Sequence, residues 1–374
     1  MPAISYSLLI NEAPASTDLL AAIQQIEVED HADMADMLRM RISISANDRC
    51  TAWTVIDDDL FPRLGKIKVL VTVGSALAEP LIEAYIIETN ANFQNQPGQS
   101  VLNVVAMDAT VLLNLQQAVK SWADMSDSDI AEDIFRAHNF QPVVEATDVT
   151  RQDVDQSTTQ RGTDLQFLRQ LATRNGYEVY VEANPLTGII EGHFHPPLLD
   201  QPDQGILSVN FRDETNVNSF TARFDMLRPT TAQVTGVDTG DLSDQQAQSD
   251  STSERELGNQ SALSPDRQRR VLLTHTGLSK AGELQTYAQS VVDRSSLAIT
   301  AEGELNTVAY GKVLRAKRPV KVRGAGTQFN GTYYVQRVLH TLTGDGYTQH
   351  FTLERNATGL SGETFVDNLA LPSV

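Results

Sequence analysis

The chain has 374 residues, of which 41% are hydrophobic and 21% are charged, as in a folded protein of about two to four domains. Its formal charge of -19 argues against nucleic acid and anionic membranes as partners, because both bind proteins through Lys and Arg. No apolar run approaches the ~18 residues of a spanning helix, and the first ten residues lack the basic start of a secretory signal, so we expect synthesis in the cytoplasm without stable membrane insertion.

Residues 1–108 predict a first domain made of β-strands. Apolar side chains alternate with polar ones over 38–44 and again over 67–73, which is typical of half-buried strands. Two further β-rich runs, 82–89 and 100–107, are separated by the turn residues Asn95-Gln96-Pro97-Gly98. Several short strands with turns between them indicate a barrel or a sandwich.

Residues 109–204 predict an α/β middle region. Asp108 is a candidate cap for a first helix, in which Leu112, Leu115, Val119 and Trp122 would share one face.

Two capping boxes predict two more helices in this region, one from Ser126 with Asp129 and one from Thr163 with Gln166. The second of these helices would end at Gly176, which supplies a left-handed cap. Strands are then expected over 177–181 and 189–194.

Residues 205–360 predict a second β-barrel domain, followed by a C-terminal tail over 361–374. Its strands are expected over 218–225, 231–237, 297–301, 319–322, 332–339 and 349–353. Residues 239–270 are rich in Asp, Gln and Ser, and this composition predicts a long exposed or disordered loop. A helix is expected over 279–294, because apolar side chains recur there at helical spacing.

Two histidines are the candidates for a metal site. His193 and His195 flank Phe194, so on a strand both rings would point to one face. Pro196-Pro197 ends the strand, and the nearby sequence offers no third ligand. We therefore interpret the pair as an exposed strand end and predict no metal or cofactor.

Acidic clusters are the candidates for general acid–base catalysis. They are Asp57-Asp58-Asp59 and the group Asp127, Asp129, Glu132 and Asp133. Their polar neighbours would not raise a carboxyl pKa, so we interpret them as solvated faces and helix N-terminal charge.

Other catalytic patterns are weak. The sequence has no Gly-x-Ser-x-Gly, and Gly324 and Gly326 sit between β-rich runs, where a hairpin turn is expected rather than a phosphate loop. The lone Cys50 is expected to be a small buried hydrophobe. No catalytic residue is predicted.

Two ordered stretches carry a family signature. The first runs from Gln160 through the helix that opens at Thr163 to Tyr180, and its motif residues are Gly162, Asp164, Phe167, Leu168, Leu171, Gly176 and Tyr177. The second runs from Gly311 to Arg355, and its motif residues are Gly311, Gly331, Tyr333, Val335 and His340. Together they resemble phage late control protein D, the baseplate hubs of contractile tails and extracellular contractile injection systems, and the hub half of VgrG proteins.

The motif residues of the second stretch also have structural explanations. Gly331 fits a turn that needs positive φ, and Tyr333 and Val335 can share one strand face. His340 is expected to be a hydrogen-bonded residue at a strand end.

The resemblance implies an α+β fold in which two β-barrel-like domains flank α/β domains and assemble as a pseudo-sixfold trimer. It implies a structural, non-enzymatic hub that joins the sixfold tail tube to the threefold spike and helps to nucleate assembly. The implied partners are other copies of the chain, a spike protein, the inner tail tube protein and other baseplate proteins. The machine is a phage tail, an extracellular injection system or a type VI-like relative; the sequence does not distinguish them.

VgrG proteins continue into a spike, whereas only 356–374 follow the last strand here. The resemblance therefore implies a separate spike protein. Phe365, Val366, Leu369 and Leu371 are candidate spike contacts, and a frayed terminus is the alternative interpretation.

Two other functions stay open. A tail-associated cell-wall hydrolase would depend on one acidic residue. A carbohydrate-binding adhesin would need exposed aromatic platforms, and with 6% aromatic residues and only Trp53 and Trp122 it is the weaker alternative.

Overall fold

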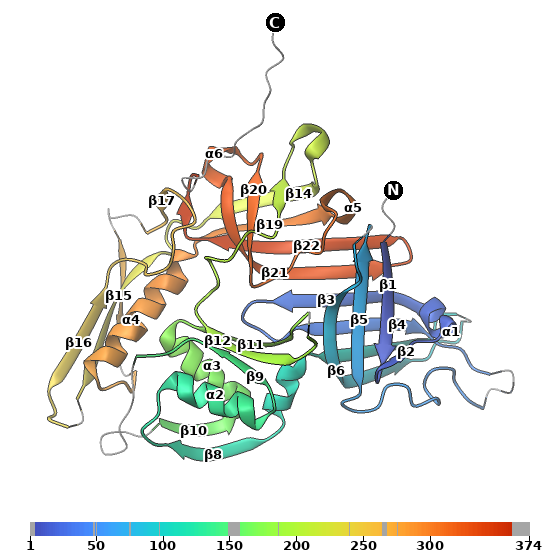
Figure 1. Cartoon of the computed structure of the whole chain (residues 1–374), viewed down its shortest axis with the longest axis horizontal. Helices are drawn as coiled ribbons and strands as arrows, with labels where there is room; N and C mark the ends of the chain where they lie inside the picture. The colour runs from blue at the N-terminus through green and yellow to red at the C-terminus, as the bar shows by residue number, and fades with distance from the viewer. Residues whose placement is uncertain are drawn as a thin grey trace, which may run out of the picture.

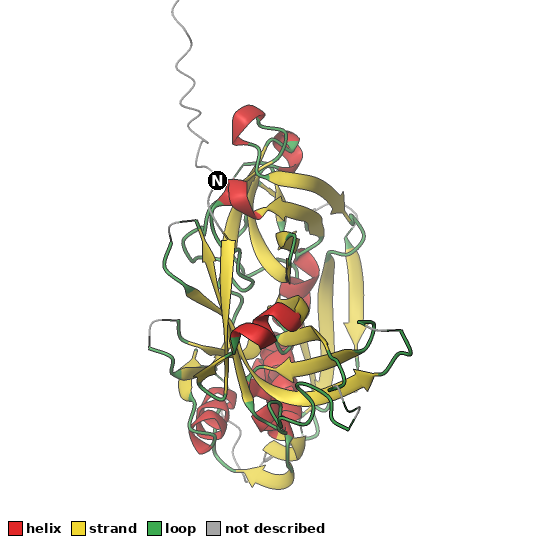
Figure 2. Ribbon diagram, turned by 90° about the vertical axis from the view of Figure 1, so that its right-hand side faces the viewer, coloured by secondary structure: helices red, strands yellow, loops and turns green. Residues whose placement is uncertain are grey.

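The computed structural model describes residues 4–47, 49, 51–74, 76–96, 98–148, 158–185, 187–238, 240–263, 268–274 and 276–360. Cys50, Pro97 of the predicted turn and the whole tail 361–374, with Phe365, Val366, Leu369 and Leu371, lie outside these residues. The described part is mostly β-sheet with few helices, which confirms the α+β class (Figure 2).

The first β-unit comprises residues 4–107 and holds the predicted alternating strands. Along β4, Leu38, Met40 and Ile42 are buried while Arg39 and Arg41 are exposed, because successive side chains point to opposite faces. The strands pair in the order β3-β4-β7-β6-β5-β1-β2. Its elements are β1 (Ile4–Ile10), β2 (Ala13–Pro14), α1 (Thr17–Ala22), β3 (Ile23–His31), β4 (Met37–Ser43), β5 (Lys66–Val73), β6 (Glu79–Asn92) and β7 (Val101–Met107).

The second β-unit is built mainly from the last third of the chain, and Tyr333, Val335 and Phe351 belong to its core. Its strands pair in the order β14-β19-β22-β21, with β20 beside β21 and β13 beside β20. Its elements are β13 (Ile206–Ser208), η2 (Arg212–Glu214), β14 (Val217–Phe224), β19 (Ile299–Asn306), α5 (Thr307–Tyr310), β20 (Pro319–Arg323), α6 (Gly326–Phe329), β21 (Gly331–Thr343) and β22 (Gly346–Arg355).

The strands of the two β-units belong to one continuous sheet (Figure 1). The long strand β21 is the reason. Its first part pairs with β20, and after an irregularity between Val335 and Arg337 its second part pairs with β3, from Arg337 opposite His31 to Thr343 opposite Gln25. The two β-units are therefore joined edge to edge through β21 and β3.

The middle unit packs α2 and α3 against small sheets, and both predicted capping boxes are present, at Ser126 with Asp129 and at Thr163 with Gln166. Gly176 ends α3 with φ of 73°, the expected left-handed cap. Its elements are η1 (Ala109–Asn114), β8 (Gln117–Trp122), α2 (Asp127–Ala137), β9 (Gln141–Val144), β10 (Thr158–Thr163), α3 (Asp164–Asn175), β11 (Glu178–Ala183) and β12 (Ile190–His195).

The first helix expected in this unit is wrong. Asp108 does cap a turn, by accepting from Thr110 N, but the turn is the short 3-10 helix η1. Residues 117–122 form strand β8, which pairs with β10 so that Trp122 lies opposite Thr158. The helical spacing of Leu115, Val119 and Trp122 was misleading, since Val119 is 83% exposed and shares no buried face.

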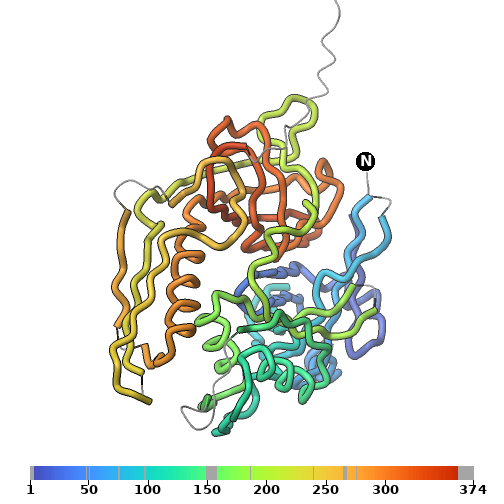
Figure 3. The backbone as a smooth tube through the Cα atoms, turned by 60° about the vertical axis from the view of Figure 1, so that its left-hand side comes forward, coloured from blue at the N-terminus to red at the C-terminus, as the bar shows by residue number. Residues whose placement is uncertain are grey.

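The remaining unit, the α4 lobe, lays helix α4 (Ala281–Ser296) on a three-stranded sheet of β15 (Thr230–Val237), β16 (Asp244–Ser249) and β18 (Arg269–Leu273) (Figure 3). The helix expected over 279–294 thus lies at 281–296. Between β16 and β18 along the chain, β17 (Gln260–Ser261) pairs with β23 (Ala357–Thr358).

The loop expected over 239–270 is corrected, because it contains β16 and β17. Ala247 belongs to the buried cluster under α4. Polar side chains hold the rest: Ser249 Oγ lies 2.8 Å from Gln289 Oε1, and Thr252 Oγ1 donates to Asp293 Oδ1 at 2.8 Å. The segment has few apolar side chains to bury, but hydrogen bonds to α4 hold it in place.

Candidate functional site

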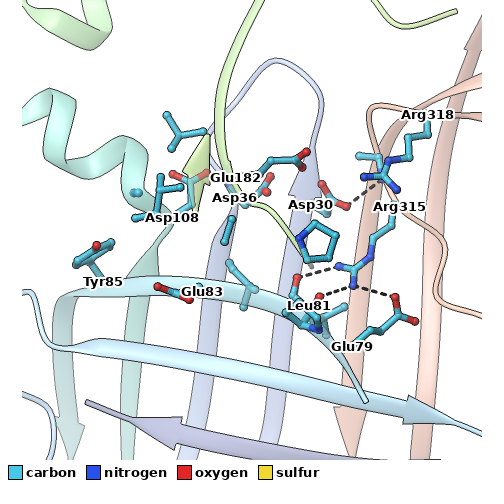
Figure 4. Close-up of a pocket in the computed structure, with 18 residues that line it drawn as sticks. Asp30, Asp36, Glu79, Leu81, Glu83, Tyr85, Asp108, Glu182, Arg315 and Arg318 are labelled. Atoms are coloured by element: carbon cyan, nitrogen blue, oxygen red, sulfur yellow. Dashed lines mark hydrogen bonds and ion pairs between the residues drawn. The ribbon is translucent and has the colours of Figure 1, made fainter. Parts of the chain in front are cut away.

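The first β-unit, the middle unit and the second β-unit meet around a cavity of about 130 Å³ (Figure 4). Asp30, Asp36 and Glu182 approach it from β3, the β3–β4 loop and β11, and Arg315 faces them from the segment before β20. Because residues from all three units line it, this junction is the first place to look for chemistry or for mechanical coupling.

Lys317 is buried next to this cavity. Its Nζ lies 2.7 Å from Asp30 Oδ1 and 3.0 Å from Asp36 Oδ2, and its backbone N donates to Val335 O at 2.9 Å. The residue has φ of 66°, in the left-handed region that residues with a β-carbon rarely adopt. A buried charge in a strained conformation persists only where its surroundings fix it firmly.

The charges of this cluster set one another's pKa values. Burial opposes the charge of Lys317, but Asp30 and Asp36 hold its pKa well above its usual range. Burial likewise opposes the charge of Asp30, yet Lys317 and Arg315 lower its pKa. For Asp36 and Asp108 burial prevails and raises the pKa. Lys317 pairs with both Asp30 and Asp36, and its charge favours the ionised form of Asp30, whereas burial opposes the ionised forms of Asp36 and Asp108.

All carboxyl oxygens of the cluster are hydrogen-bonded within the protein. Each of the six carboxyl oxygens of Asp30, Asp36 and Asp108 accepts a hydrogen bond of 2.7–3.1 Å, from the Lys317 ammonium or from the backbone N–H of His31, Asp36, Thr110 or Ala316. A general acid or base would need an oxygen aimed at a substrate. This geometry fits a structural role, in which the cluster is a clamp that holds the first and second β-units together.

Arg315 extends the clamp to β6. Its guanidinium donates to the carbonyl oxygens of Leu81, at 2.9 Å, and Pro80. Its own backbone N and O bond to the side chain of Gln204, each at 2.8 Å. The segment 315–317 therefore holds strands of the first β-unit from within the second.

The first set of motif residues builds the middle unit. Gly162 has φ of 112°, and a β-carbon there would lie 2.5 Å from Gln166 Oε1, which caps α3. Asp164 Oδ2 lies 2.7 Å from His138 Nε2. Tyr177 Oη donates to Ala146 O at 3.1 Å. Three more residues lie in the buried core, namely Phe167, Leu168 and Leu171.

The second set builds the second β-unit. Gly311 caps α5 in the left-handed region, and Gly331 opens β21 with φ of 131°. Tyr333 and Val335 are both buried. The expected strand-end position of His340 is wrong: it lies inside β21, because the strand continues to Thr343 to pair with β3, and its Nδ1 bonds to Tyr347 Oη at 2.7 Å.

Motif residues also surround Arg355, whose guanidinium is buried. It donates to the carbonyl oxygens of Asn330, Leu257 and Gly359 at 2.7–2.8 Å and lies over the Tyr333 ring. A β-carbon at Gly331 would come within 3.0 Å of it. Arg355 thus ties the polar segment near 257 to the end of the last sheet strand.

The interpretation of His193 and His195 as an exposed strand end is wrong, because both are buried, at 7% and 5% exposure. Tyr180 stacks on His193, whose Nδ1 lies 3.2 Å from His195 Nε2. Burial lowers the pKa of His193 to about 3 and also lowers that of His195. Among the described residues, no group of three or more His, Cys, Asp or Glu is arranged to hold a metal ion.

The acidic clusters singled out in the sequence take separate places. Asp127 pairs with Arg174 and accepts from Asn175, and Asp129 completes the capping box of α2. Glu132 pairs with Arg136 on the helix surface. Residues 57–59 are exposed in the loop between β4 and β5, far along the chain from the others. The structure does not bring these carboxylates together.

A second cavity, of about 180 Å³, lies where the middle unit, α4 and the second β-unit meet. Tyr334 Oη donates to Glu178 at 2.6 Å inside it. Burial raises the pKa of Glu178 to about 8 and that of Glu254, which also lines this cavity, to about 7. Both groups therefore favour the neutral carboxyl form when the chain is folded.

Sequence reasoning missed the Lys317 cluster. Lys317 and Asp30 are 287 positions apart, and no local pattern signals such a contact. One hint was available: Arg315, Lys317 and Arg318 form a dense basic run in a chain of charge -19. A basic run that precedes a strand in an acidic protein needs acidic partners.

Comparison with known proteins gives one matching family and several solved structures of similar fold. Residues 5–344 match the family model of the Alg8 N-terminal domain. No curated protein matches the chain. Within the described ranges no helix is long and apolar enough to cross a membrane.

The fold is similar to that of a tail protein from Neisseria meningitidis MC58, with a TM-score of 0.63 and 12% identity over 94% of this chain and 97% of that one. It is also similar to the 43 kDa tail protein of prophage MuSo2 from Shewanella oneidensis, with a TM-score of 0.62 and 12% identity over 94% and 98%. A third similar structure is the E. coli c3393 protein, described as a type VI secretion component that resembles the T4 tail proteins gp27 and gp5. Its TM-score is 0.56, with 12% identity over 93% and 76%. At these identities the likeness establishes the fold.

Proposed function

The chain belongs to the Alg8 N-terminal domain family, and we propose that it is the structural hub of a contractile tail baseplate. In this role three copies form a ring that joins the inner tail tube to a spike protein. The protein is made in the cytoplasm and works in the assembled tail of a phage particle or injection machine. Its role is mechanical rather than enzymatic.

One observation carries the proposal: the fold agrees from end to end with tail proteins of similar size. About 94% of this chain aligns with 97–98% of two of them, so the similarity is not confined to one common domain. The order of the two motif sets along the chain, in the middle unit and in the second β-unit, supports the same assignment.

The two β-units supply the mechanism. Each chain contributes two mainly antiparallel units that lie side by side in one sheet (Figure 1). In a ring of three chains, these units make six positions around the axis, so one face can meet a sixfold tube while the threefold symmetry of the whole meets the spike.

Such an adaptor must hold its two β-units in a fixed relation. Pairing of β21 with β3 does this through the backbone, and the Lys317 and Arg315 contacts do it through side chains. A charge of -19 fits protein partners better than nucleic acid, because DNA or RNA binding depends on basic surfaces.

The hydrolase alternative has one observation in its favour. Glu178 and Glu254 line one cavity, and burial raises the pKa of both, as a general acid requires. Glu178, however, is occupied by the Tyr334 hydroxyl. Lysis of purified cell wall by the wild-type chain, lost in Glu178→Gln, would favour this alternative.

The test is the mass of the purified chain by light scattering, alone and mixed with the spike protein. The hub assignment predicts a particle of about three times 41.0 kDa, either alone or formed on mixing. A chain that stays at the monomer mass in the presence of the spike, at concentrations well above the micromolar range, would contradict the assignment.

A further inference from the structure

One end of the molecule carries an exposed basic and apolar surface. In the α4 lobe, β18 pairs with β15 on one side and with no described strand on the other. Leu272 on β18 is 61% exposed, and in the turn after β14 the exposed fractions of Met226 and Leu227 are 70% and 76%. We call the surface of Met226, Leu227, Arg269, Arg270 and Leu272 the basic patch.

The basic patch borders the free edge of β18 from both faces of the sheet, and its two arginines have no ion-pair partner among the described residues. Arg269 Nη1 donates to Leu227 O at 3.5 Å, which joins the strand to the turn. Arg270 and Leu272 are two positions apart on one strand and so share a face, whereas Arg269 points to the other face. Neither Arg269 nor Arg270 forms an ion pair with another described residue, although the chain carries 48 acidic residues.

Another part of the chain carries the opposite chemistry. In the loop between β4 and β5, Asp57, Asp58 and Asp59 are exposed, and Trp53 N donates to Asp57 Oδ2 at 2.5 Å. Phe93, 54% exposed, meets Trp53 edge to face with ring centroids 4.7 Å apart. We call the surface of Trp53, Asp57, Asp58, Asp59 and Phe93 the acidic patch.

The two patches belong to different parts of the molecule, the α4 lobe with the adjoining turn after β14 and the first β-unit. In Figure 1 the sheet of β15 and β16 forms the left-hand end, whereas the blue loop after β4 extends at the right-hand end. Two complementary patches so placed cannot meet within one copy. They can meet between copies in a head-to-tail contact, which closes into a ring when the rotation per copy allows it.

We propose, on the premise of the trimeric hub, that the basic patch of one copy docks on the acidic patch of the next copy around the ring. Arginine forks bind carboxylates through paired hydrogen bonds and stack on aromatic faces, so both components of the acidic patch have a counterpart. Arg, Met, Trp and Phe are also the residue types enriched in protein interfaces. Copies with a charge of -19 repel one another overall, so a ring needs such local complementarity.

Charge reversal at each end tests this contact. The double variants R269E/R270E and D58R/D59R each place like charges across the interface, and each should raise the concentration at which trimers form by at least about tenfold. Combining all four changes in one chain restores opposite charges and should restore the trimer. The matched control is K120E/R161E, which makes the same charge change as R269E/R270E on the exposed β8–β10 ribbon, away from both patches.

Circular dichroism and thermal unfolding of each variant separate lost assembly from lost folding, and R269Q/R270Q replaces R269E/R270E if the reversal does not fold. Trimers that persist unchanged in both double variants would overturn this contact while leaving the hub assignment intact. Loss in both that the fourfold variant does not repair would also overturn it. A wild-type chain that never trimerises, even with the spike protein, would overturn the contact and the hub assignment together.

Discussion

At the scale of single residues, Lys317 depends strongly on its surroundings. It combines a buried ammonium, a left-handed backbone and contacts to two carboxyl groups from the first β-unit. Such a residue stabilises the fold only while its partners are in place, because removing one side of a buried ion pair leaves the other uncompensated.

We predict that Lys317→Met lowers the free energy of unfolding by about 3–5 kcal/mol, because Asp30 loses its counter-charge inside the protein. Lys312→Met is the control, since Lys312 is exposed a few residues away. Urea unfolding followed by tryptophan fluorescence measures both. Equal, small effects of the two changes would show that the cluster does not clamp the β-units.

The raised pKa of Glu178, about 8, predicts a pH dependence of stability. The folded chain holds this proton more tightly than the unfolded chain, whose glutamates titrate near their usual value. The stabilisation is therefore complete at low pH and is lost as the pH rises through 8. Thermal unfolding should shift to lower temperature between about pH 5 and pH 9.

Glu178→Gln should remove part of that shift and leave the variant more stable than the wild type at pH 9, because an amide can still accept from Tyr334 and never ionises. The exposed Glu12→Gln is the matched control. If the unfolding temperature of the variant followed the same pH curve as the wild type, Glu178 would not be the group responsible.

At the scale of elements, Gly176 lies at a point where the end of α3 approaches α4. Gly176 has φ of 73°, and a β-carbon there would lie 3.1 Å from Ser290 Cβ on α4. Gly176 thus both caps α3 and lies at the contact between the middle unit and the α4 lobe.

Gly176→Ala should destabilise the chain by about 2–3 kcal/mol, from the left-handed backbone together with the contact to α4. Gly98→Ala, which has a similar φ and open space around its β-carbon, should cost only about 1–2 kcal/mol. The difference between the two, from denaturant unfolding, isolates the helix contact. No difference would mean that α4 can move aside at no cost.

Local signals predicted the elements they govern. The alternation at Leu38–Ile44 and the capping residues Ser126 and Thr163 depend on neighbours within four positions, and the structure has β4, α2 and α3 there. The predictions failed where distant contacts decide. Residues 117–122 form a strand because β10 pairs with them, and 244–249 form a strand because β15 and α4 cover them.

The candidate sites show the same division. The left-handed conformations of Gly176 and Gly331 follow from local turn chemistry. The burial of His193 and His195 depends on which units meet in space, and so does the choice of partners for Lys317. The spacing of residues along one sequence does not encode such contacts.

At the scale of the whole molecule, the central claim is that one chain supplies two positions of a sixfold ring. The edge-to-edge pairing of β3 with β21 makes the two β-units parts of one sheet, so they should move as one body within the assembly. The lobe formed by α4 and its three strands then lies at the end of the long axis, where a neighbouring copy can reach it (Figure 1).

Electron microscopy of the purified assembly, viewed along its axis, tests this claim most directly. The account predicts a closed ring with threefold symmetry in which six similar lobes surround the centre, two from each chain. A ring of three lobes, an open filament or isolated single chains would contradict it.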